Sequence, residues 1–120
     1  MTVVVVAAAG RRWTVPAARV REVAELVQLT PVPTAPGSVV GLTQLRGQIL
    51  PVLDPLPESE RTPPAPPRAP RPGDPLLIVE LGPVRAALWV EKVLGVGDGD
   101  PTAAPIDVGA LFDRLRKPHQ

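Results

Sequence analysis

The sequence predicts a small, mostly β protein, built as small barrels or a sandwich with little helix. Short runs rich in Val, Leu and Ile recur at the length of single strands, and Gly and Pro separate them. The 120 residues include 18 Pro and 10 Gly but only 2 Trp, 1 Phe and no Tyr, so the core must consist mainly of Val, Leu, Ile and Ala. A chain of this length forms one domain, or two very small units that share a core.

The first thirty residues begin with a predicted hairpin. Residues 2–9 are β-branched and then small, a turn follows at residues 10–12, and Trp-Thr-Val at residues 13–15 resumes the apolar pattern. After Pro16 the apolar residues fall at i, i+3, i+4 and i+7, which predicts a helical turn or two before a short strand near residues 26–29. These apolar positions are Val20, Val23, Ala24 and Val27.

A second predicted hairpin occupies residues 39–54, after three prolines that favour an extended path through residues 31–36. Its turn contains Arg46 and Gly47, and its second strand spans residues 48–53. Pro51 lacks a backbone N–H, so this strand is expected at a sheet edge or with a bulge.

The next segment is the least able to form a core. Residues 55–72 hold eight prolines and three arginines and no β-branched aliphatic residue. We therefore expect a flexible loop or linker over residues 55–74, inside a single domain that spans residues 1–120. A proline-motif ligand for SH3-type domains is an alternative, although such matches arise easily by chance.

The last third predicts two more strands and a helix. Residues 76–81 form a strand, Gly82 and Pro83 a turn, and residues 84–90 a second strand that runs into residues 93–96. A glycine-rich loop follows, without the lysine of a phosphate-binding loop. Four apolar residues then lie at helical spacing within residues 106–115. They are Val108, Leu111, Phe112 and Leu115.

Composition excludes most enzyme classes. The chain has no Cys, and its one histidine is His119, so no Cys-ligated metal, thiolate nucleophile or buried His-based site is expected, and no cofactor. A hydrolase would lack a positioned base. A formal net charge of +1 and the scarcity of aromatics count against a nucleic-acid-binding barrel. The longest apolar run, residues 3–9, is too short to cross a bilayer and resembles no signal peptide, so we expect a cytoplasmic protein.

The run GLTQLRGQILPVLD at residues 41–54 resembles the signature of the CheW-like family, the adaptors of bacterial chemotaxis. Two flanking segments agree with it. The first is VREV at residues 20–23, and the second is VELG at residues 79–82 leading into LWVEKVLGV at residues 88–96.

This resemblance implies a fold of two SH3-like β-barrels around a shared core, with a short C-terminal helix. It also implies a non-catalytic adaptor that binds the cytoplasmic tip of methyl-accepting chemoreceptors, at chemoreceptor arrays, and couples them to a CheA-type histidine kinase. The alternative is an accessory CheW-like protein that binds receptors but has lost kinase docking.

The sequence departs from the family pattern at four places, one of which is Ala86-Ala87, where a glycine is common in the family. A proline-rich stretch follows Asp54, Glu91 stands where the family has an aspartate, and only about two dozen residues follow Val96. Strands usual in the family are therefore missing or compressed, and we expect one of the two barrels to be incomplete.

The resemblance places partner binding at Arg46, Glu22 and Val20. The alternatives are a solvated or internally paired arginine, and an exposed charge beside a core valine. Gly41 and Gly47 are also candidates for the interface, although turn and bulge geometry is the simpler reason for glycine there.

Leu88 and Val90 are the remaining candidates for partner contact, and their simpler role is in the core of a strand. Trp89 alternates with them and should face the opposite side, where it forms a contact surface or is buried between the two barrels.

Overall fold

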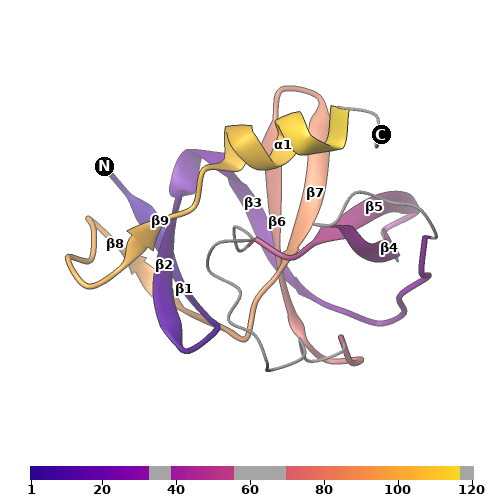
Figure 1. The fold of residues 1–120 in the computed structure, drawn as a ribbon, viewed down its shortest axis with the longest axis horizontal. Coiled ribbons are helices and arrows are strands. Elements are labelled where there is room, and N and C mark those ends of the chain that lie inside the picture. The colour runs from indigo at the N-terminus through magenta and orange to yellow at the C-terminus, as the bar shows by residue number, and fades with distance from the viewer. Residues whose placement is uncertain (33–38, 56–69, 117–120) are drawn as a thin grey trace.

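Two β-sheets pack against each other and against one short helix (Figure 1). The fold is taken from a computed structural model that describes residues 1–32, 39–55 and 70–116, with side chains up to residue 113. In chain order the elements are β1 (Val3–Ala8), β2 (Arg11–Pro16), a 3-10 helix η1 (Ala17–Arg19), β3 (Val20–Glu25), β4 (Val39–Leu45), β5 (Gln48–Leu53), β6 (Pro75–Leu81), β7 (Val84–Trp89), β8 (Lys92–Gly97), β9 (Ala104–Pro105) and α1 (Val108–Arg116).

The first sheet has the strand order β8-β1-β2-β9 and starts from the predicted hairpin. β1 and β2 pair from Val3 opposite Pro16 to Ala8 opposite Arg11, so the turn consists of Ala9 and Gly10 alone. Both turn residues have positive φ, 51° and 73°, as the two-residue turn that matches strand twist requires. Arg11 and Arg12 therefore belong to β2 rather than to the turn.

The second sheet has the strand order β3-β6-β7-β5-β4 and curls so that its two edge strands approach each other. After β3 the chain reaches across, and Thr30 exchanges two backbone hydrogen bonds of 2.8 Å with Leu42 of β4. The Thr43 hydroxyl also donates to the Gln28 carbonyl oxygen at 2.8 Å. These contacts close the second sheet into a small barrel.

The predicted helical turn over residues 20–27 is wrong, because Val20–Glu25 is the strand β3. Val23 and Val27, which a helix would bury together, are 54% and 75% exposed. Four apolar residues matched the helical spacing by coincidence, whereas pairing with β6 satisfies the backbone of the segment. The only helical turn here is η1, and residues 26–29 form no strand.

Pro51 does not place β5 at an edge, because β5 lies between β7 and β4. Opposite Pro51 stands Leu42, whose N–H and carbonyl are both bonded to Thr30, so the ladder requires no N–H from Pro51. Pairing of β5 with β7 begins only at Val52. The register shift in the β4–β5 ladder lies in β4, between Val39 and Gly41.

The core has two parts, separated by the second sheet. A central cluster joins both sheets to α1, and a second cluster fills the barrel. β6 shows the division, since Leu77 and Val79 join the central cluster while Leu76 and Ile78 join the barrel interior. Burial on both faces explains why β6 reads as a continuous apolar run.

The chain passes back to the first sheet at Val90 and Glu91, where the predicted continuous strand is interrupted and β8 begins. The incomplete barrel that the sequence predicted corresponds to this first sheet. Within the described residues it has four strands, and its edge strand β9 has only two residues. The C-terminal helix is confirmed as α1, over the central cluster.

Most of the predicted proline-rich loop, residues 56–69, and the proline stretch at residues 33–38 lie outside the described part of the chain. The end of the predicted loop is a hydrogen-bonded turn. The Arg71 N–H donates to an Asp74 carboxylate oxygen at 2.8 Å, and the Gly73 N–H donates to the Leu26 carbonyl at 2.7 Å.

Candidate docking surface

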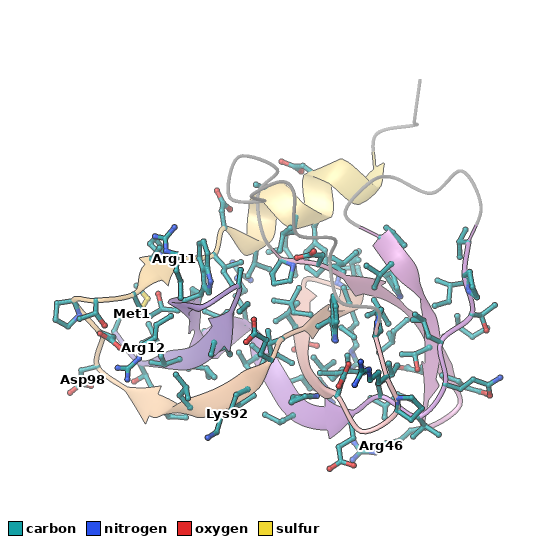
Figure 2. The ribbon with its side chains drawn as sticks, turned by 60° about the horizontal axis from the view of Figure 1, so that its bottom comes forward. Met1, Arg11, Arg12, Arg46, Lys92 and Asp98 are labelled. Atoms are coloured by element: carbon teal, nitrogen blue, oxygen red, sulfur yellow. The ribbon has the colours of Figure 1, made fainter. Side chains whose placement is uncertain are left out.

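Arg46 lies at the tip of the β4–β5 hairpin, at one end of the barrel (Figure 2). Arg46 and Gly47 form the turn with φ of 49° and 80°, the same geometry that Ala9 and Gly10 adopt in the first hairpin. Since alanine serves at the equivalent position of that hairpin, the backbone alone does not explain an arginine at position 46. A non-glycine residue with positive φ is uncommon and draws attention to its side chain.

Glu22 comes from β3, at the opposite edge of the second sheet, and is the ion-pair partner of Arg46. Its Oε2 accepts a hydrogen bond from Nη1 of Arg46, whereas its Oε1 is buried without a hydrogen-bond partner within the described residues. The intramolecular pair that the sequence left open is therefore present. The tertiary structure brings together two residues that are 24 positions apart.

Three more charged residues extend this cluster along the same end of the barrel. Glu80 of β6 lies 3.8 Å from Arg21 of β3 and 3.3 Å from Arg85 of β7. Nη1 of Arg85 also donates to Oε1 of Gln48, the first residue of β5, at 3.0 Å. The starts of β3, β5 and β7 and the end of β6 thus form one polar surface, which we call the charged end: Arg21, Glu22, Arg46, Gln48, Glu80 and Arg85.

A groove of about 480 Å³ lies beside the hairpin tip, within the charged end. It is lined by Gln48, Ile49, Leu50, Glu80, Gly82, Pro83 and Arg85. Ile49 is 68% exposed and Val84, next to Pro83, is 39% exposed. The groove is mostly polar, and the exposed Ile49 lies among its charged side chains. An exposed apolar residue surrounded by polar groups is typical of surfaces that other proteins contact.

In two ion pairs of the charged end, the arginine is more exposed to solvent than the glutamate. The side chains of Arg46 and Arg21 are 76% and 51% exposed, whereas those of their carboxylate partners Glu22 and Glu80 are 23% and 31% exposed. The side chains of Arg46 and Arg21 therefore face solvent more than the carboxylates that pair with them, whereas Arg85 is as buried as Glu80. A planar guanidinium presented in this way suits a carboxylate or a carbonyl oxygen of another protein.

Gly41 is explained by close packing of the backbone, which agrees with the structural role that the sequence offered as the simpler alternative to partner contact. A Cβ at this position would lie 2.8 Å from the Leu29 side chain and from the Thr30 carbonyl oxygen. Gly47 has open space around it and positive φ, so the turn explains it. Val20 is half-buried and packs against the central cluster, beside the charged end.

The structure places Leu88 and Val90 in the central cluster, with 0% and 2% exposure. We therefore remove both from the candidate interface. Trp89 does face the opposite side, as predicted, and packs against the barrel cluster with its indole N–H donating to Asp74 at 2.9 Å. It is partly buried against the cluster of the second barrel and does not lie between the barrels.

Sequence reasoning missed Arg21, Glu80, Arg85 and Ile49. A signal for Arg21 was present, since it lies between the selected residues Val20 and Glu22. Ile49 follows the selected Gly47 by two residues, in the strand after the turn. For Glu80 and Arg85 the only available signal was the register of the β6–β7 hairpin, in which the two residues stand opposite each other.

The described residues contain no group of three or more His, Cys, Asp or Glu side chains placed to hold a metal ion. None of the helices described here is long and apolar enough to cross a membrane.

The fold is that of a protein built from two SH3-like β subdomains around a shared core, one closed and one short. A family model described as "CheW-like domain" matches residues 2–105. The chain belongs to this family, which consists of non-catalytic scaffold proteins of chemotaxis.

A solved structure agrees with this assignment. The scaffolding protein TtCheW from Thermoanaerobacter tengcongensis is similar with a TM-score of 0.64 and 28% sequence identity. The match covers 83% of this chain and 66% of that chain, so this chain corresponds to just under two-thirds of TtCheW. No curated protein matched in the corresponding comparison.

Proposed function

We propose that this protein is a chemosensory adaptor that binds the cytoplasmic tip of methyl-accepting chemoreceptors through its charged end. In this proposal it works in the cytoplasm at receptor arrays, and it makes and breaks no bond. Family membership supports an adaptor in general, and the receptor is the partner that the family resemblance implies.

The observation that carries the proposal is the presentation of Arg46. Its side chain projects from a hairpin tip, is 76% exposed although paired with Glu22, and borders a groove with an exposed isoleucine. A preorganised guanidinium near an exposed isoleucine supplies both a charge and an apolar contact for a protein partner, at little further cost in side-chain entropy.

The first test is capture of a receptor signalling fragment by the purified protein. We expect Arg46→Glu to weaken capture at least about tenfold, because a charge reversal at the centre of an interface adds repulsion. Arg12→Glu is the matched control, since Arg12 is also an exposed arginine, 3.4 Å from a carboxylate of Asp100, but lies on the first sheet. Equal capture by wild type and Arg46→Glu would contradict the proposal.

A second variant separates a structural role of Arg46 from a binding role. Arg46→Glu alone places two carboxylates together, and Glu22 is partly buried, so the fold itself is at risk. The double variant Glu22→Arg/Arg46→Glu keeps an ion pair and should recover the stability of the wild type. If Arg46 touches the receptor, the double variant still fails to capture it, and recovered capture would show that the pair only closes the barrel.

The alternative function is an accessory protein that binds receptors without recruiting kinase. Two observations support this alternative. The first sheet is short, and the match covers only 66% of TtCheW, so a surface that docks the kinase can be absent from this chain. Capture of the regulatory domain of a CheA-type kinase at micromolar affinity would establish the complete coupler. Receptor capture without kinase capture would establish the accessory protein.

A further inference from the structure

β8 forms a free edge of the first sheet. Its inner side pairs with β1, and within the described residues no strand pairs with its outer side. The strand is also apolar and accessible, since Leu94 is 41% exposed and Val96 is 70% exposed. An exposed edge of this kind can accept a strand from another chain.

The sequence of β8 is complementary to itself. Residues 92–98 read KVLGVGD, so that Lys92 and Asp98 stand three positions before and after Gly95, and Leu94 and Val96 stand directly beside it. An antiparallel pairing of two copies centred on Gly95 brings each Leu94 beside the Val96 of the other copy. It also brings each Lys92 beside the other copy's Asp98, and a two-fold axis makes every contact twice.

The two charged residues are available for this contact. Both Lys92 and Asp98 are exposed, and neither belongs to an ion pair recorded among the described residues. Figure 2 shows them at opposite ends of β8, on the outside of the molecule. A lysine on an edge strand normally discourages pairing, but here the same lysine meets an aspartate when the partner is a second copy.

The centre of the pairing also allows close approach. Gly95 has no side chain, and no atom lies within 4 Å of the position that its Cβ would take. The β1–β8 ladder has a bulge beside it, where the register shifts between Val5 and Val6. The bulge limits the length of a regular ladder, which favours a weak and reversible contact.

We propose that β8 is the contact through which two copies of this chain associate, by antiparallel edge pairing around Gly95. The opposite edge of the same sheet is β9, which has two residues and includes Pro105, a residue without a backbone N–H. Only one edge of the sheet can therefore extend, and the assembly closes as a dimer rather than growing into a fibre. This inference does not depend on the proposed function, because β8 lies on the other sheet from the charged end.

Sedimentation equilibrium of the purified full chain tests the dimer. We expect concentration-dependent association by about 1 mM protein, where even a millimolar dissociation constant populates a dimer. Lys92→Asp and Asp98→Lys should each weaken association about tenfold, because each creates two like-charge contacts. An equimolar mixture of the two single variants should associate again, since one chain then carries both acidic residues and the other both lysines.

The mixture makes the experiment decisive, because a variant that had merely lost its fold could not regain association by mixing. A wild type that stays monomeric at about 1 mM would overturn the proposal, and so would a mixture that associates no better than either variant alone. Val96→Lys should also weaken association, with Val27→Lys as its control at a residue 75% exposed outside β8. Equal weakening by both would place the contact elsewhere.

Discussion

At the scale of single residues, the closure of the barrel depends on the absence of a side chain at Gly41 and on the ion pair between Arg46 and Glu22. Gly41 lets the segment after β3 approach β4 closely enough for Thr30 to bond with Leu42. The ion pair between Arg46 and Glu22 connects the β4–β5 turn with β3 through their side chains. One small residue and one ion pair thus add to the hydrogen bonds that close the barrel.

Gly41→Ala should therefore lower the free energy of unfolding by about 1–3 kcal/mol, because the added Cβ meets the Thr30 carbonyl oxygen and the partly buried Leu29 side chain at 2.8 Å. Denaturant unfolding followed by circular dichroism measures this. Gly97→Ala is the control, since no atom lies within 4 Å of its Cβ position, and its effect should stay within about 0.5 kcal/mol. Similar losses in both variants would contradict the close-approach argument.

Asp100 gives a prediction about pH. Its Oδ1 accepts hydrogen bonds from the Thr102 hydroxyl at 2.6 Å and the Thr102 N–H at 2.8 Å, and Arg12 lies 3.4 Å from Oδ2. These contacts, the Thr102 hydroxyl first, hold the pKa of Asp100 below its ordinary value of 3.8. The stabilising contribution is thus complete above pH 3.8 and is lost as the pH falls through the lowered pKa.

Thr102→Val removes the hydroxyl while keeping the backbone N–H. We expect the pKa of the Asp100 carboxyl to rise toward its ordinary value, as measured by a carboxyl titration in NMR. The acid side of the stability profile should become less steep in the variant. An unchanged titration of Asp100 would show that the hydroxyl contributes nothing.

At the scale of elements, the stability of the short helix α1 depends on its N-terminal cap and on its packing against the central cluster. Oδ1 of Asp107 accepts a hydrogen bond from the Ala110 N–H at 3.0 Å, which caps the first turn. Phe112 and Leu111 are 1% and 4% exposed. A helix of nine residues is not stable by itself in water, so these tertiary contacts hold it.

Asp107→Ala should lower the free energy of unfolding by about 1 kcal/mol, because it leaves the first-turn N–H groups without their acceptor. Thermal unfolding of the variant measures the loss. Asp113→Ala removes an exposed acidic residue of the same helix and should change stability by less than about 0.5 kcal/mol. A larger effect at position 113 would argue against the capping role.

At the scale of the whole molecule, the central cluster makes the two sheets depend on each other. Val6 and Val15 from the first sheet, Leu77 and Leu88 from the second and Phe112 from α1 belong to one buried group. We therefore propose that residues 1–120 form a single cooperative domain, since neither sheet can cover its inner face alone.

Two tryptophans allow a direct test of this cooperativity. Trp13 lies in the first sheet with 3% exposure, and Trp89 packs in the barrel of the second. Trp13→Phe and Trp89→Phe each leave one fluorescent reporter, and both variants should show a fluorescence transition that coincides with the loss of far-ultraviolet circular dichroism. A fluorescence midpoint that differs from the circular dichroism midpoint in either variant would contradict a single domain.

The sequence by itself determined the class of fold, the first two hairpins with the turn of the second, the β6–β7 hairpin and the final helix, because strand alternation, glycine-containing turns and helical spacing are local signals. It placed the first turn at residues 10–12, whereas the turn consists of Ala9 and Gly10. It also selected Arg46 and Glu22, through their resemblance to a family pattern. It misread β3 as helical, since four apolar residues matched the helical spacing and only the pairing with β6 shows that the segment is a strand.

Only the tertiary structure decided what surrounds Arg46 and which apolar residues are available to a partner. Glu22, Glu80 and Arg85 meet near the hairpin tip because strands distant in sequence end at the same end of one barrel. The sequence left Leu88 and Val90 between a role in the core and a contact with a partner, and their packing against the other sheet and the helix decides for the core. Contacts between strands far apart in sequence have no local signature, and the charged end consists of such contacts.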